Sequence, residues 1–210
     1  MTDKMTIPYA VADFHRLITE GKYYVDKTMY IPRLEKYSSP VYLRPRRFGK
    51  SLLCSTLYYY YERTQASHFQ ELFGGTYIGK NPTEKQGQMI VVRFDFSAME
   101  VCSDMARLER NFNDLNKHPV DIAAYHNRDI LPGFEFSDMK SASKMLEDLL
   151  AYIKHNSLPK VYIIIDEYSL KGSEILYPEN QDEMITEYFH DLPVDVRSHY
   201  EKLWEDLLIG

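Results

Sequence analysis

Two runs of β-branched and other apolar residues predict buried strands. One run lies within residues 89–96 and the other is residues 161–165. A shorter run, residues 41–43, follows Pro40 and has the length and the bounding breaker of a third buried strand. Such runs, separated by helices, are typical of a parallel sheet that is covered on both faces. The pattern therefore predicts an α/β fold.

Apolar residues at helical spacing predict the helices around these strands. In the clearest of them Met145, Leu149 and Ile153 recur every four positions and form one apolar stripe. A helix after Pro193 carries Trp204 on a similar stripe, and we expect it to pack on its own domain rather than dock on a partner. The predicted helices cover residues 12–20, 52–63, 104–116, 139–155 and 196–207.

The composition is that of a folded protein. The chain has 210 residues, of which 44% are hydrophobic and 27% charged, with nine glycines and ten prolines. These values exclude collagen-like, low-complexity and wholly disordered chains. The longest apolar run, residues 161–165, is far shorter than the roughly 20 residues of a membrane-spanning helix. Because residues 1–9 also lack an apolar signal segment, we expect a cytoplasmic protein without a membrane span.

Charge is distributed unevenly along the chain. Residues 1–60 carry ten basic and five acidic side chains, whereas residues 171–210 carry three basic and ten acidic ones. A basic region attracts polyanions such as nucleotide phosphates or nucleic acid. The first part of the chain is therefore the place to look for an anion site.

The tripeptide Gly49-Lys50-Ser51 lies between the strand predicted at 41–43 and a predicted helix, which is the setting of a Walker A loop. In such a loop backbone N–H groups at the helix N-terminus bind phosphate oxygens, Lys50 faces the terminal phosphates and Ser51 ligates Mg2+. Arg44 stands where the first glycine of the motif is usual, and Pro45 follows it, so the loop must turn by a different geometry. The alternative is a chance tripeptide beside solvated arginines.

A second acidic element follows the last predicted strand. Asp166 at the strand end can hold a metal ion through Ser51 and water, and Glu167 can orient or deprotonate the attacking water. The alternative is an ordinary charged strand end. The hypothesis of Mg-nucleotide hydrolysis requires that Lys50 and Ser51 lie close to Asp166 and Glu167, although the two segments are far apart in the sequence.

The segments around these motifs resemble the predicted AAA-ATPase-like proteins of bacteria and archaea, over about residues 7–168. The resemblance implies a P-loop NTPase-like parallel sheet flanked by helices, ATP as the ligand, and Arg44 as a family trait. It divides the chain into an AAA-ATPase-like domain, residues 1–168, and an acidic, partly helical tail of unknown role, residues 169–210. The matching segments are residues 7–9, 13–14, 24–28, 43–52, 94–97 and 165–168.

The chain departs from the family pattern after Asp166. The Walker B motif of the family usually continues with a second Asp and a nearby Pro, whereas Tyr168-Ser169-Leu170 follows here. Many members also carry a C-terminal nuclease-like domain of the PD-(D/E)XK type, for which residues 169–210 are too few. We therefore expect an incomplete P-loop fold, truncated or rearranged after Walker B.

The resemblance implies a set of nucleotide-binding residues. Asp26, Lys27 and Thr28 are assigned near the base or ribose by family analogy, with a solvated turn as the alternative. Asp95 supports the Mg2+ shell or, alternatively, caps a helix. No Asn-Lys-x-Asp sequence is present, so ATP is preferred to GTP. The predicted nucleotide-binding residues are Asp26, Thr28, Arg46, Arg47, Phe48, Gly49, Lys50, Ser51 and Leu52, with Ser51 and Asp166 at the metal and Glu167 as the catalytic base.

Three functional hypotheses follow. The first is an ATP-binding AAA-like P-loop protein that acts as a Mg-dependent ATPase. The second is a non-hydrolysing nucleotide-binding or protein-interaction module. The third is a nucleic-acid-binding protein that uses Arg44, Arg46, Arg47 and Lys50, whose affinity would fall steeply with salt. The sequence identifies no protein partner.

Overall fold

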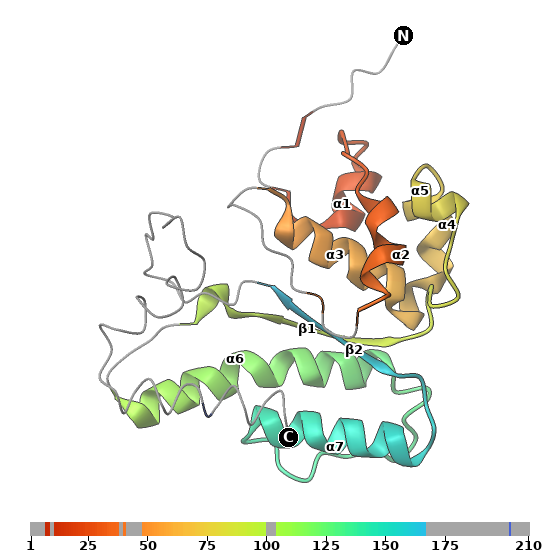
Figure 1. Cartoon of the computed structure of the whole chain (residues 1–210). Coiled ribbons are helices and arrows are strands. Elements are labelled where there is room, and N and C mark those ends of the chain that lie inside the picture. Colours follow the sequence, from red (N-terminus) through yellow and green to blue (C-terminus); the bar gives the residue numbers. More distant parts are fainter. Residues whose placement is uncertain are drawn as a thin grey trace. The chain divides into compact units, whose positions relative to one another are not determined.

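Two of the predicted strands lie side by side in a two-stranded parallel sheet (Figure 1). Strand β1 spans Ile90–Asp95 and strand β2 spans Val161–Asp166. The computed structural model describes residues 7–8, 11–37, 40, 48–99, 104–166 and 202. The predicted α/β class is confirmed. The strand predicted at 41–43 lies outside the described residues, as does the helix predicted at 196–207 except for Lys202.

The chain divides into two units. The first consists of Met1–Arg93 and Pro159–Asp166, and the second of Phe94–Leu158 and Glu167–Gly210. Strand β1 passes from the first unit to the second after Arg93. No helix among the residues described has both the length and the apolar character needed to cross a bilayer.

The first unit contains five α-helices among its described residues. The longest of them, α3, packs against α1 and against β2. Helix α1 begins where Asp13 accepts a hydrogen bond from the Arg16 N–H, and the apolar spacing predicted at 12–20 corresponds to this helix. The helices are α1 (Phe14–Thr19), α2 (Ile31–Leu34), α3 (Lys50–Tyr61), α4 (Phe69–Phe73) and α5 (Tyr77–Lys80).

An aromatic core holds α3 in this unit. The rings of Phe14 on α1 and Phe73 on α4 lie 4.9 Å apart, and the ring of Tyr60 on α3 lies 5.6 Å from that of Phe73. All three side chains are fully buried. Aromatic side chains bury large apolar areas, so these contacts fix the position of α3 against α1 and α4.

A buried carboxylate links the end of α3 to the beginning of β1. Glu62, 1% exposed, follows directly after α3. Its carboxylate accepts hydrogen bonds from the Val91 N–H at 2.7 Å and from the Thr64 N–H at 3.1 Å. These bonds satisfy backbone donors that burial would otherwise leave unpaired. The residue that follows α3 is therefore linked to strand β1 by a buried hydrogen bond.

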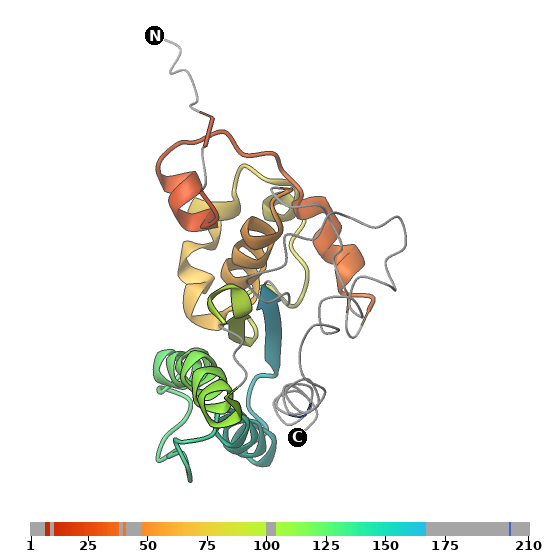
Figure 2. The ribbon, with the colours of Figure 1, turned by 90° about the vertical axis from the view of Figure 1, so that its left-hand side faces the viewer.

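The second unit contains α6 (Met105–His126) and α7 (Ala142–His155), which lie side by side (Figures 1 and 2). The Ala142 N–H at the beginning of α7 donates to Asn113 of α6 at 2.8 Å. Helix α6 continues well beyond the predicted range of 104–116 and passes through Pro119. The prediction was too short because the buried stripe of Phe112, Val120 and Ala123 continues across the proline.

Burial raises the pKa of several tyrosines of the first unit. Desolvation is the largest cause in each case, and the pKa of Tyr58 rises to about 12. The ordinary tyrosine pKa is about 10, so the unfolded chain loses these protons at a lower pH than the folded one. The affected residues are Tyr24, Tyr58, Tyr59, Tyr60, Tyr61 and Tyr162.

We therefore expect the free energy of unfolding to be unaffected by these tyrosines below about pH 10 and to fall as the pH rises above it. Absorbance at 295 nm, which detects tyrosinate, should show part of the tyrosines ionising only when the far-UV circular dichroism is lost. The same titration in guanidinium chloride should give one transition near pH 10. Complete ionisation near pH 10 with native circular dichroism would contradict the expectation.

Candidate functional site

The N-terminus of α3 presents backbone N–H groups that have no acceptor within the helix. Gly49 precedes the helix with φ 78°, a left-handed conformation that glycine adopts without strain. The first intrahelical bond runs from the Leu53 N–H to the Gly49 carbonyl at 2.9 Å. The N–H groups of Lys50, Ser51 and Leu52 therefore have no intrahelical acceptor, and within the described ranges no side chain caps them. A helix N-terminus of this kind attracts anions.

A second lysine lies beside this helix end. The Nζ of Lys27 donates a hydrogen bond to the Phe48 carbonyl at 3.0 Å. A Cβ atom placed on Gly49 would lie 3.7 Å from the same Nζ, which is an ordinary contact distance, so the φ angle and not space favours glycine here. Lys27 thus adds positive charge next to the turn that carries Lys50. Lys27 belongs to the segment assigned near the base or ribose by family analogy, and that assignment stays a prediction.

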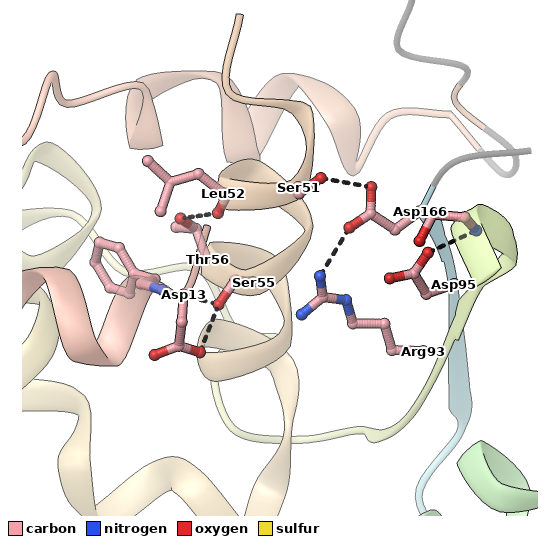
Figure 3. A network of polar contacts seen from close by, with 10 residues as sticks. Asp13, Ser51, Leu52, Ser55, Thr56, Arg93, Asp95 and Asp166 are labelled. Carbon is pink, nitrogen blue, oxygen red and sulfur yellow. Dashed lines mark hydrogen bonds and ion pairs between the residues drawn. The ribbon is translucent and has the colours of Figure 1, made fainter. Parts of the chain in front are cut away.

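Ser51 and Asp166 meet although they are 115 positions apart in the sequence (Figure 3). The Ser51 hydroxyl, in the first turn of α3, donates to Asp166 Oδ1 at 3.0 Å. Asp166 is the last residue of β2 and is 4% exposed. This hydrogen bond confirms the part of the predicted proximity that concerns Ser51 and Asp166. It follows from the packing of α3 against β2.

Arg93 pairs with the other oxygen of the same carboxylate (Figure 3). An Nη of Arg93 donates to Asp166 Oδ2 at 2.7 Å, and the Arg93 side chain is 29% exposed. Arg93 lies on β1, the strand next to β2. Sequence reasoning missed this residue. The available signal was an arginine inside an otherwise apolar strand, since a charge in such a place usually has a partner.

The donor set of this pair suits a hard cation. Ser51 and Asp166 offer oxygen ligands, and Mg2+ is usually bound through one or two carboxylates together with substrate phosphates and water. Among the residues described, no group of three or more histidine, cysteine or acidic side chains is placed to hold a metal ion. Mg2+ at this place would therefore need oxygen ligands from a nucleotide and from water.

Comparison with known protein families identifies the chain. The family described as predicted AAA-ATPase matches residues 8–206. The chain belongs to the predicted AAA-ATPase family. Its membership supports a P-loop, ATP-binding protein at the level of the family. The match continues past residue 168, where the resemblance noted in the sequence ends, to residue 206. The chain matched no curated protein and no solved structure.

In this predicted AAA-ATPase, Asp26 and Thr28 bind backbone groups of the protein itself. Asp26 accepts hydrogen bonds from the Thr28 N–H at 2.8 Å and from the Tyr77 N–H at 2.7 Å. The Thr28 hydroxyl, which is buried, accepts from the Ile78 N–H at 3.1 Å. These contacts hold the beginning of α5, so both residues have a structural role. Their predicted contact with a base or ribose stays a prediction.

Of the remaining predicted residues, the structure describes Phe48, Leu52 and Asp95. Phe48 is 56% exposed, and Leu52 packs partly buried against the aromatic core. Asp95, in the second unit, accepts a hydrogen bond from the Ser97 N–H at 2.9 Å and so caps a short 3-10 turn, Phe96–Ala98. Its predicted support of the Mg2+ shell stays untested. Arg44, Arg46, Arg47 and Glu167 lie outside the residues that the structure describes.

Proposed function

We propose that the chain binds Mg-ATP at the N-terminus of α3 and hydrolyses it. The observation that carries the proposal is the 3.0 Å hydrogen bond between the Ser51 hydroxyl and the Asp166 carboxylate. A hydroxyl that can ligate a metal and a buried carboxylate thus lie next to a helix end whose first N–H groups have no acceptor within the helix. The family membership supports the same class of ligand.

In this proposal the chain binds the phosphates through backbone and cationic groups. The N–H groups of Lys50, Ser51 and Leu52 donate to phosphate oxygens, and the Lys50 ammonium faces the terminal phosphates. Arg46 and Arg47, just before Phe48, add positive charge to the same loop. These residues form the Walker A loop of the proposal.

Ser51 and Asp166 would hold Mg2+, with Ser51 as a direct ligand and Asp166 acting through water. When bound, Mg2+ supplies positive charge that neutralises the phosphates during transfer. Glu167 accepts a proton from the attacking water, whose oxygen bonds to the γ-phosphorus while the bond to the bridging oxygen breaks. ADP and inorganic phosphate are the products.

The test of binding is a titration with a fluorescent ATP analogue, with and without Mg2+, on the parent chain and on Lys50→Ala. Charge-assisted hydrogen bonds contribute about 1.5–3 kcal/mol, so loss of Lys50 should weaken binding by roughly tenfold to a hundredfold. Lys85→Ala removes an exposed lysine elsewhere in the same unit and serves as the matched control. Circular dichroism should show that all three chains are folded.

Saturable binding that Lys50→Ala weakens and Lys85→Ala leaves unchanged supports the proposal. Two results would oppose it: a parent chain that does not bind the analogue with or without Mg2+, and a Lys50→Ala chain that binds as tightly as the parent.

A further inference from the structure

We infer that Arg93 is an internal cation of the metal site, which neutralises Asp166 in the nucleotide-free protein and competes with Mg2+ for this carboxylate. The inference rests on the proposed function, because it concerns the metal that would accompany ATP. It adds a residue that determines how strongly nucleotide binding depends on Mg2+.

The first support is the occupancy of the carboxylate. Both Asp166 oxygens already have partners, the Ser51 hydroxyl on Oδ1 and the Arg93 guanidinium on Oδ2. The Asp166 side chain is only 5% exposed, so water can do little to stabilise its charge. A buried carboxylate needs a cation or several hydrogen bonds, and Arg93 supplies the cation.

The second support is electrostatic. A divalent cation bound through Ser51 and Asp166 would share that carboxylate with a guanidinium 2.7 Å from its other oxygen. Two cations on one carboxylate repel each other, and a low-dielectric environment strengthens the repulsion. The positive charge of Arg93 therefore lowers the affinity of the site for Mg2+. A neutral residue at position 93 removes the repulsion and leaves the carboxylate to the metal.

The third support is that the Arg93 guanidinium makes fewer hydrogen bonds than it could. Arginine can form two parallel hydrogen bonds with a carboxylate, yet here one Nη makes the contact with Asp166. The Nε of Arg93 is buried and has no hydrogen-bond partner in the described part of the chain. By contrast, the buried carboxylate of Glu62 receives hydrogen bonds on both of its oxygens from the protein backbone. The Arg93–Asp166 pair is thus a single-contact pair that a stronger cation can displace.

The experiment compares neutral and charged residues at position 93. The dissociation constant of a fluorescent ATP analogue is measured in Mg2+ and in EDTA, and the ratio of the two values reports the Mg2+ dependence. Arg93→Gln should raise the EDTA-to-Mg2+ ratio by about fivefold to tenfold over the parent, because the repulsion is gone. Arg93→Lys, which keeps the charge, should stay within about twofold of the parent ratio.

A matched control and a second neutral variant accompany these. Arg16→Gln makes the same change in an exposed pair with Glu20 and should leave the ratio unchanged. Arg93→Met, of similar length and without charge, replaces Arg93→Gln should that variant fail to fold, and should show the same rise.

The outcomes separate this inference from the proposed function. A parent that binds the analogue through Lys50, combined with neutral variants whose ratio equals or falls below the parent ratio, overturns the inference alone. A fall would identify Arg93 as a residue that supports metal binding. A parent without binding, or with binding that Lys50→Ala does not weaken, overturns the proposed function and the inference together.

Discussion

Replacing Glu167 with glutamine is expected to abolish ATP turnover and to leave ATP binding intact. Glu167 directly follows Asp166 in the sequence, and Asp166 is the residue whose carboxylate accepts the hydrogen bond from Ser51. A positioned general base contributes about 10²- to 10⁴-fold to a rate, and glutamine keeps the shape of glutamate while losing its basic oxygen. Steady-state release of inorganic phosphate measures the loss, and the fluorescent ATP analogue measures the binding.

Two further variants are the controls for the phosphate-release measurement. Glu147→Gln changes an exposed glutamate of α7, paired with Lys144, and should release phosphate at the parent rate. Lys50→Ala, assayed at an ATP concentration that leaves its weakened site mostly empty, gives the background from contaminating enzymes. A parent that binds ATP through Lys50 and releases no phosphate above this background would instead support the non-hydrolysing nucleotide-binding or interaction module. Turnover that survives in Glu167→Gln would place the base on another residue.

The parts of the site that were predictable from the sequence depend on local chemistry. The apolar runs of β1 and β2 leave little alternative to strands, because β-branched residues favour the pleated sheet. Their burial was less predictable, since most residues of β2 are only half-buried. The apolar spacing predicted a helix over 52–63, and the observed helix begins two residues earlier, at Lys50. Gly49 precedes it with a left-handed φ, which explains why glycine stands there. The proximity of Ser51 and Asp166 followed from placing the N-terminus of a helix beside the C-terminal end of a strand. Helix α3 runs antiparallel to β2, because Tyr61 at its other end contacts Tyr162 near the beginning of β2.

Other features depend on contacts between distant segments, which no local pattern reports. The partner of Arg93 depends on which strand lies next to β1 and in which register. Family analogy suggested a ligand contact for Asp26 and Thr28, whereas these residues accept hydrogen bonds from Tyr77 and Ile78, about 50 residues away. Such tertiary hydrogen bonds satisfy buried donors, and any nearby polar side chain can provide them.

Replacing Phe73 with alanine is expected to cause the largest loss of stability in the first unit. The side chain is fully buried, and its ring lies within 4.9–5.6 Å of the rings of Phe14, Tyr60 and Phe69. Truncating a buried phenylalanine costs about 3–5 kcal/mol, a large share of the 5–15 kcal/mol that stabilise a typical domain. Urea denaturation followed by far-UV circular dichroism measures the change in the free energy of unfolding.

Phe48→Ala is the matched control, because it removes the same ring at a position that is 56% exposed and should change stability by no more than about 0.5 kcal/mol.

The two variants also test whether the aromatic core and the nucleotide site belong to one folding unit. A ligand that binds only the folded chain at a hundredfold its dissociation constant adds about 2.7 kcal/mol. Mg-ATP analogue should therefore recover much of the stability that Phe73→Ala loses, since Tyr60 of this core and Ser51 of the site lie on the same helix, α3. Equal stability losses in the two variants would contradict the assignment of Phe73 to the core, and a Phe73→Ala chain that the analogue binds but does not stabilise would separate the site from that core.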